Sequence, residues 1–342
     1  MLETIWFVLW ALLWAMYFIL DGFDLGIGSL LPFAARNEGE RRVMFNATGP
    51  FWDGNEVWLI SAGGVTFAAF PKTYAVMFSA LYVPLLLLLF TLILRAVSYE
   101  FRNKIDHPAW RSLWDWVHFL TNFAAAVLLG VAFANLFRGI PIDANGVFHG
   151  NLLTFLNFYG LAGGLFFLVM FALHGALWLC FKTKGEMQER ALAYVYLLWP
   201  LTLICLVGFL WLTAFYTDLF KNYFSNPVLF IIPVIAVVGL VGILVMLLRK
   251  KILLAWASSC LFIIGVTFFG VMGMFPRMLI SSMDRAATLT AFNSSSSELT
   301  LTIMLGVALV MVPIVLIYQF WAYRLFSHKL DPEQVMSDSH SY

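Results

Sequence analysis

The sequence predicts an all-α polytopic membrane protein, and two observations lead to that class. Hydrophobic residues make up 62% of the 342 residues and charged residues only 11%, with a mean hydropathy of +0.88. A water-soluble domain could not bury this much apolar surface. Apolar runs of about 20 residues, the length that crosses a bilayer as a helix, also recur along the chain. We therefore expect a single integral membrane domain over residues 1–327.

Nine such runs give the expected transmembrane helices in order. The first run is too long for the apolar part of a cleavable signal and follows Glu3 instead of Lys or Arg, so we expect it to remain as a span. The segment at residues 328–342 is polar, and we expect a short, mobile tail. The nine spans lie near residues 5–31, 50–70, 74–97, 113–136, 152–181, 191–215, 226–248, 252–277 and 299–325.

The distribution of Lys and Arg predicts the orientation. When the connections are taken alternately, beginning with the one that holds Arg36, Arg41 and Arg42, one side of the membrane carries 15 of the 20 basic residues and the other carries 5. Basic residues concentrate in cytoplasmic loops. The N-terminus is therefore expected outside and the C-terminus in the cytoplasm. Nine helices would allow two four-helix bundles plus one extra helix, although periodicity alone does not establish that arrangement.

Two pairs of acidic residues lie inside expected spans. Asp21 and Asp24 occur in LDGFDLGIG, and Asp53 and Glu56 occur in PFWDGNEVWLI. A carboxylate placed in hydrocarbon costs about 2.5 to 3.5 kcal/mol, so such residues usually face a partner, water or a cofactor. The expected topology puts both pairs in the cytoplasmic half of the membrane. We interpret the four acids as candidates for a proton path.

Further charged residues fall at the same level of the membrane. Arg95 and Glu100 end the third expected span, and Asp115 begins the fourth. Arg95 is the expected counter-ion for at least one carboxylate. Simpler interpretations stay open, because Asp53 would also be stabilised by the positive end of its helix dipole. Arg95 and Asp115 would also suit interfacial positions, where long side chains extend to water.

The remaining chemistry-bearing residues point to few alternatives. His118 and His174 are the histidines within spans, and two facing histidines are one way to hold a haem, although packed histidines are commoner. The cysteines, Cys180, Cys205 and Cys260, are far apart in apolar segments, which is typical of packed thiols. No basic run indicates nucleic acid, and neither a P-loop nor GxSxG, HExxH or GxGxxG occurs. The residues alone leave a transporter or a subunit of an energy-coupling complex.

Several motifs resemble one family along the whole chain. They are LDGFDLGIG at 20–28, RRVMFNATGPFWDGNEVWLISAGG at 41–64, WDW at 114–116, GVAFANL at 130–136, HGALWLCFKTKGEMQERA at 174–191, MFPRMLISS at 274–282, SELTLTIM at 297–304 and VPIVLIYQFWAYRLF at 312–326. These segments resemble subunit II of the cytochrome bd-type quinol oxidases. The resemblance implies two four-helix bundles plus a peripheral helix, in agreement with the nine runs.

The resemblance also implies a function and roles for single residues. The complex would oxidise quinol and reduce dioxygen to water with protons drawn from the cytoplasm, and Asp53 would lie at the mouth of a proton channel at the subunit interface. Asp24, Arg95 and Asp115 match positions linked to assembly or to the haem environment, and we group Glu100 with them because it ends the same span as Arg95. Asp21 and Glu56 are assigned to the proton path by their physics alone.

The implied cofactors and partners belong to the complex. Subunit I would carry the quinol site and ligate two haems b and one haem d, so this chain would hold no haem ligand and no metal. Other expected partners are a small accessory subunit, membrane lipids and quinone, in the plasma membrane of a prokaryote. Two rival hypotheses remain: a proton- or cation-coupled transporter, and a purely structural subunit whose acids carry no protons. The sequence does not distinguish ubiquinol from menaquinol.

Overall fold

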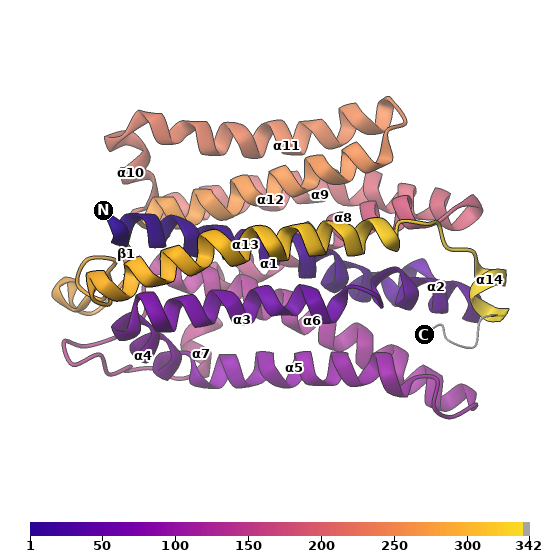
Figure 1. Cartoon of the computed structure of the whole chain (residues 1–342), viewed down its shortest axis with the longest axis horizontal. Coiled ribbons are helices and arrows are strands. Elements are labelled where there is room, and N and C mark those ends of the chain that lie inside the picture. The colour runs from indigo at the N-terminus through magenta and orange to yellow at the C-terminus, as the bar shows by residue number, and fades with distance from the viewer. Residues whose placement is uncertain (338–342) are drawn as a thin grey trace.

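The computed structural model describes residues 1–337 and is almost entirely helical (Figure 1). The elements are α1 (Leu2–Ala34), α2 (Glu38–Thr48), α3 (Trp52–Ala69), α4 (Pro71–Ala80), α5 (Tyr82–Phe101), α6 (Pro108–Arg138), α7 (Leu152–Phe155), α8 (Phe158–Lys182), α9 (Gly185–Tyr216), α10 (Leu219–Ser225), η1 (Pro227–Phe230), α11 (Ile231–Leu248), α12 (Ile252–Met274), β1 (Arg277–Leu279), η2 (Arg285–Ala287), β2 (Leu289–Thr290), α13 (Glu298–Leu325) and α14 (Pro332–Ser337).

Eight helices within residues 1–337 are long and apolar enough to cross a membrane: α1, α5, α6, α8, α9, α11 with η1, α12 and α13. They run roughly side by side along the long axis of the molecule (Figure 1). The expected span at residues 50–70 corresponds to α3, which has 18 residues but is not among the eight. Asp53, Asn55 and Glu56 lower the hydropathy of its first turns. The count of nine transmembrane helices therefore stays a prediction.

Two expected spans are divided into shorter helices. The third is split into α4 and α5 at Leu81, because Pro84 has no N–H for the carbonyl of Ala80 and its ring crowds that turn. The fifth is split into α7 and α8, where the side chain of Asn157 caps α8 by accepting a hydrogen bond from the Gly160 amide. Local chemistry at one residue interrupts an apolar run in both cases.

Helix α1 is the central element of the fold. It packs against α3, α6, α8 and α12, and its second half is buried almost without a break. The contact with α8 is a backbone-to-backbone approach at Gly26, where a Cβ atom would lie 1.8 Å from the carbonyl oxygen of Phe171. The hydrophobic effect does not drive helices together within a bilayer, so helix pairs rely on close packing. Small residues such as glycine allow that close approach. The acids of α1 are consequently held in the middle of the protein.

The two ends of the molecule differ in character. At one end, called the β1 end, lie the N-terminus, α4, α10 and the small antiparallel β1–β2 sheet (Figure 1). At the other, called the α14 end, lie α2 and α14, and α14 packs against α2. The C-terminal segment packs against the rest of the protein up to α14. Val335 is buried, and the Lys184 ammonium pairs with Asp331 at 2.8 Å. Residues 328–337 thus contact the helix bundle, the mobility of the tail stays a prediction, and residues 338–342 lie outside the described part.

Candidate functional site

One ion cluster joins three helices inside the protein. The guanidinium of Arg95 on α5 lies 2.7 Å from the carboxylate of Asp21 on α1 and also contacts the carboxylate of Glu56 on α3. The side chains of Arg95 and Asp21 are fully buried, and that of Glu56 is 21% exposed. Arg95 is therefore the counter-ion that the sequence predicted, and it has two partners. We call Asp21, Asp24, Glu56 and Arg95 the Arg95 cluster.

The charges in the Arg95 cluster do not balance when every group is ionised. The cluster holds one guanidinium and three carboxyl groups, because Asp24 is also fully buried and lies one turn after Asp21 on α1. Burying unpaired charge is costly, and a second carboxylate close to a first disfavours ionisation of both. One guanidinium therefore cannot neutralise all three carboxyl groups of the cluster when every one of them is ionised.

Asp24 is held by an amide from α3 and not by a cation. Its Oδ2 atom accepts a hydrogen bond of 2.7 Å from Asn55, whose amide also donates to the carbonyl of Leu20 at 3.0 Å. The hydroxyl of Tyr323 on α13 donates to the Asn55 carbonyl at 2.8 Å. A chain of hydrogen bonds thus connects α1, α3 and α13. Asn55 is the asparagine of the WDGN motif, and it fixes the orientation of the Asp24 carboxyl.

Several buried atoms of this region have no hydrogen-bond partner among the described residues. They are Oδ1 of Asp24, Nε and Nη1 of Arg95, and the hydroxyl of Tyr17, which lies one turn before Asp21. The Oδ1 atom of Asp21 contacts Arg95 as an ion pair without hydrogen-bond geometry, and its Oδ2 atom also has no hydrogen-bond partner among the described residues. Buried polar atoms are almost always satisfied by protein or by ordered water. The Arg95 cluster therefore retains hydrogen-bonding capacity that water molecules can use.

Asp53 lies outside the buried cluster. It is exposed in the first turn of α3, where the helix dipole favours a negative charge, and it forms no ion pair with any residue in 1–337. Glu56 follows three residues later on the same helix, so the two carboxyl groups lie one turn apart. Glu56 thus connects an exposed acid with the buried cluster. From the sequence, Glu56 was the less certain member of the Asp53–Glu56 pair, but it is Glu56 that contacts Arg95 in the structure.

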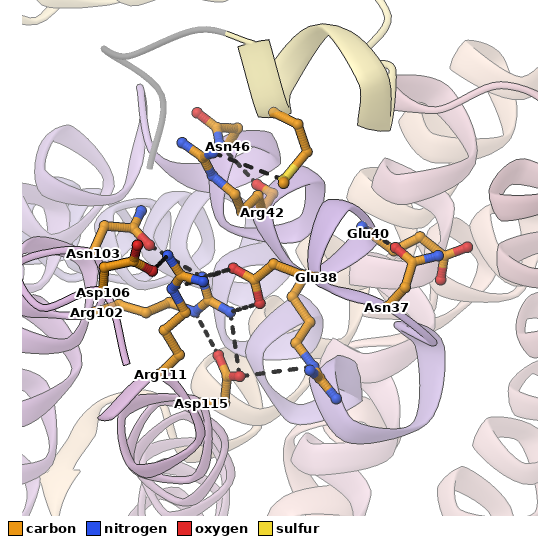
Figure 2. Close-up of polar contacts among 12 residues, drawn as sticks. Asn37, Glu38, Glu40, Arg42, Asn46, Arg102, Asn103, Asp106, Arg111 and Asp115 are labelled. Carbon is orange, nitrogen blue, oxygen red and sulfur yellow. Dashed lines mark hydrogen bonds and ion pairs between the residues drawn. The ribbon is translucent and has the colours of Figure 1, made fainter. Parts of the chain in front are cut away.

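Asp115 belongs to a second cluster at the α14 end (Figure 2). Arg102 follows α5 and is 1% exposed. It donates two hydrogen bonds of 2.9 Å to Glu38 of α2 and two, of 2.6 and 3.3 Å, to Asp115 of α6. Arg41 lies 3.7 Å from the same Asp115. We call Glu38, Arg102 and Asp115, with Arg41, the Arg102 cluster. It connects α2, α5 and α6 and does not contact the acids of α1.

The electrostatics of Glu38 follow from this arrangement. Partial burial raises the pKa of the Glu38 carboxyl, but the hydrogen bonds and charge of Arg102, with the charge of Arg111, outweigh that effect and leave the pKa below its usual value. The carboxylate is therefore ionised at neutral pH and contributes to the attachment of α2. Paired guanidinium and carboxylate groups of this geometry act as a structural clamp.

The other residues singled out from the sequence have separate positions. Glu100 is exposed near the end of α5, away from the buried face that carries Arg95. His174 is buried, with Nδ1 2.6 Å from the Ser259 hydroxyl and Nε2 2.9 Å from the Ile19 carbonyl. His118 is buried with Nδ1 2.8 Å from the Ser98 hydroxyl. Both histidines therefore hold helices together, which was the commoner of the two interpretations of these residues.

Sequence reasoning missed two residues beside the Arg95 cluster and two within the Arg102 cluster. Asn55 and Tyr323 hold the buried acid of α1, and Glu38 and Arg102 form the core of the Arg102 cluster. Asn55 stood within the quoted WDGN motif, so its polarity inside an expected span was an available signal. Glu38 and Arg102 resembled ordinary loop charges, and no pattern distinguished them before the fold placed α2 beside α5 and α6.

The fold and the site define a polytopic helical membrane protein with buried carboxyl groups and an arginine counter-ion inside its helix bundle. The sequence profile of the cytochrome bd terminal oxidase subunit II family matches residues 2–326. Cytochrome bd ubiquinol oxidase subunit 2 of Bacillus subtilis strain 168 is 35% identical over 341 residues, covering 98% of this chain and 99% of that protein. Cytochrome bd-I ubiquinol oxidase subunit 2 of Escherichia coli K12 is 35% identical over 374 residues, covering 99% and 98%. The chain belongs to this family.

A solved structure shares the fold. The bd oxidase from Geobacillus thermodenitrificans superposes with a TM-score of 0.79 at 18% sequence identity, covering 95% of this chain and 98% of that one. Family membership makes the chain a subunit of a terminal oxidase, a quinol:oxygen oxidoreductase complex that contains haem, in the prokaryotic plasma membrane. A subunit I partner follows from the same membership. The transporter hypothesis is thereby set aside.

Proposed function

We propose that this subunit supplies protons to the oxidase complex through the acids of α3 and α1. Asp53 is the acid at the cytoplasmic surface, Glu56 is the next proton-binding group, and Asp21 and Asp24 are the buried ones. The observation that supports this path is the Arg95 cluster, in which one guanidinium pairs with Asp21 and Glu56 while a third carboxyl group, that of Asp24, is buried without an ion pair among the described residues. Protonation of one carboxyl relieves the charge imbalance, and deprotonation restores it.

The proposed path depends on a topology with nine transmembrane helices. We place the N-terminus outside and the C-terminus in the cytoplasm, with α3 as the ninth span, two four-helix bundles, and α13 as the peripheral helix. The charge distribution between the two ends supports this orientation. The side chains of α13 are mostly exposed, as expected for a peripheral helix. In this topology both ion clusters lie toward the cytoplasmic side.

Haem ligation and quinol oxidation are assigned to subunit I. His174 does not fit a haem ligand, because both its ring nitrogens have hydrogen-bonding partners, and Nδ1 of His118 is engaged as well. Two haems b and one haem d would supply electron transfer and dioxygen reduction in that subunit. The residues of this chain contribute at a distance by holding protons, excluding lipid and supporting the partner. A small accessory subunit and bound quinone complete the proposed complex.

The test of the proton path is the substitution Asp53→Asn in the purified two-subunit complex. The amide keeps the shape of the side chain but cannot carry a proton, so quinol-driven oxygen consumption should fall by about a hundredfold, the lower end of the range for a lost proton-transfer group. Haem content, read from the absorption spectrum, should stay at the wild-type level. Proton uptake should be followed with a pH indicator after mixing the reduced complex with oxygen.

Two further variants make the result specific. Asp53→Glu retains a carboxyl group and should restore most of the lost rate, whereas Asp106→Asn removes an exposed acid at the same end and should have no effect. Unchanged proton uptake in the Asp53→Asn complex would leave this chain as a structural subunit. Glu56→Gln should slow proton uptake as well, because the Glu56 side chain is partly exposed and also contacts Arg95.

A further inference from the structure

A cavity of about 220 Å³ lies between α9 and α11, and we call it the α9–α11 groove. Its two threonines, Thr213 and Thr267, donate their hydroxyls to carbonyls of their own helices, so neither presents a free donor. The cavity therefore has no group that would recognise a polar ligand. Its aromatic lining includes Phe133, Phe166, Phe167, Phe209, Phe220 and Phe230.

The length of the groove matches part of one membrane leaflet. Toward the α14 end, beyond the lining residues, the indole of Trp199 on α9 donates a hydrogen bond to the carbonyl of Leu240 on α11 at 2.8 Å and joins the two helices. Toward the β1 end it reaches α10. The lining of α9 extends from Leu206 to Thr213, or about 10 Å at 1.5 Å per residue. One leaflet of hydrocarbon is about 15 Å thick.

The groove opens on the outside of the helix bundle. Val237 of α11 lines it and is 58% exposed, and Phe230 lines it and is 41% exposed. These side chains belong to a helix of very high hydropathy, whose outer surface faces lipid in a membrane. A hydrocarbon chain in the adjacent leaflet can therefore enter from the side.

Basic residues lie near the end of the groove at α10. Arg138 follows the lining residue Phe137, and its guanidinium lies 5.7 Å from the ring centre of Tyr216. Lys221 follows the lining residue Phe220 and pairs with Asp218 at 2.7 Å. Asp218 also lies in the field of two further cations, Arg277 and Arg285. We call Arg138, Lys221, Arg277 and Arg285 the basic rim; with Asp218 included, positive charge remains in excess.

We propose that the α9–α11 groove binds one acyl chain of an anionic phospholipid, with the lipid phosphate at the basic rim. The apolar lining and depth suit a single chain from the leaflet at the β1 end. The rim selects for negative charge, since Arg and Lys at the edge of the hydrocarbon attract anionic headgroups. A neutral isoprenoid chain would fill the groove but would not use the rim. The lipid would occupy the gap between α9 and α11 and hold the α11–α12 hairpin against the bundle.

Native mass spectrometry of the delipidated two-subunit complex tests the proposal, with phosphatidylglycerol and phosphatidylcholine added separately as probes. The wild-type complex should bind phosphatidylglycerol at one site about tenfold more tightly than phosphatidylcholine, a difference of about 1.4 kcal/mol. Val237→Trp places a ring in the groove and should abolish binding of both lipids at this site. Its matched control is Val238→Trp, a neighbouring position with 56% exposure outside the lining, which should bind as wild type does.

The rim is tested apart from the packing. Arg138→Gln with Arg285→Gln should reduce the preference for phosphatidylglycerol to nearly equal binding, while Lys72→Gln, a basic residue at the same end of the molecule, should preserve it. Haem spectra of all variants report assembly, and the rim variants remain informative even when Val237→Trp fails to assemble. Equal binding of the two lipids by the wild type, unchanged binding in Val237→Trp, or a neutral isoprenoid quinone in place of phospholipid would each overturn the proposal.

Discussion

At the scale of single residues, Arg95 determines whether the buried acids are tolerated. Its guanidinium contacts carboxylates from two other helices and is itself fully buried. Removing one partner of a buried ion pair leaves an uncompensated charge, which is far more costly than the pair is stabilising. We therefore expect Arg95 to act in assembly, whereas the acids around it are the ones proposed to carry protons.

Replacement of Arg95 by Met is expected to destabilise the complex by about 3 to 5 kcal/mol, the range for breaking a buried pair. Yield of assembled complex and haem absorbance should both fall sharply. Adding Asp21→Asn to the same chain removes one of the stranded carboxylates and should recover part of the yield. Leu94→Met on the exposed face of the same helix serves as the control. A normal haem spectrum with normal yield in Arg95→Met would contradict this role.

The carboxylate of Glu38 makes a pH-dependent contribution. Its folded pKa lies below the reference value of 4.5, so its stabilising effect is fully present above pH 4.5 and is lost as pH falls through the folded pKa. We expect Glu38→Gln to lower the free energy of unfolding of the complex at pH 7 by less than about 1 kcal/mol, because the side chain is partly exposed and screened. The Tm of the complex should fall accordingly. The Tm difference from wild type should shrink toward pH 4. A difference that does not change with pH would show that Glu38 acts through packing.

At the scale of secondary-structure elements, the crossing of α1 and α8 holds the buried acids in place. Gly26 and Gly175 bring the two backbones together, with a Cβ on Gly175 only 2.6 Å from the Ile27 nitrogen. Backbone atoms cannot move aside in the way that a side-chain end can. The position of Asp21 and Asp24 thus depends on glycines that carry no chemistry.

Gly26→Ala should therefore disrupt the complex although it adds a single methyl group. The new Cβ would overlap the Phe171 carbonyl, which forces α1 and α8 apart. Gly208 on α9 is the matched control, because no atom lies within 4 Å of a Cβ built there, and Gly208→Ala should be neutral or slightly stabilising. Thermal unfolding followed by tryptophan fluorescence compares the two variants. Equal Tm values would show that the helices can adjust.

At the scale of the whole molecule, the C-terminal segment ties distant parts of the chain together. The ammonium of Lys182, at the end of α8, donates to the carbonyls of Phe326 and His328, the latter at 3.0 Å. The ammonium of Lys329 donates to the carbonyl of Thr183 at 3.0 Å. Helix α14 also packs on α2, the helix that carries Glu38. The C-terminal segment therefore joins α2 to the loop between α8 and α9.

Deletion of residues 328–342 should lower the Tm of the complex by several degrees, because the contacts of Lys182 with His328, of Thr183 with Lys329 and of Lys184 with Asp331 are lost and Val335 no longer covers α2. Deletion of residues 338–342 alone leaves these contacts in place and provides the control. Limited proteolysis of both forms shows whether α2 becomes accessible. Equal stability of the two deletions would mean that the tail contacts contribute nothing to the fold.

Much of the architecture follows from the sequence, because each apolar run needs no information from the rest of the chain to become a helix. The runs predicted all of the long helices, and the acids within two of them predicted a polar interior. The structure contains two helix breaks and one helix that were not predicted. The break at Leu81 depends on Pro84, the one at Asn157 on side-chain capping, and α2 is a polar segment without apolar periodicity.

The sequence by itself determined that this is a helical membrane protein, placed Asp21, Asp24, Asp53 and Glu56 within its apolar segments, and indicated its family. Only the tertiary structure decided which acid contacts which cation. Asp115 was expected beside the other acids but pairs with Arg102, while Glu56 reaches Arg95. The physical reason is that an ion pair forms between helices, and the distance between side chains on different helices depends on the crossing of their backbones. No single segment of sequence contains that information.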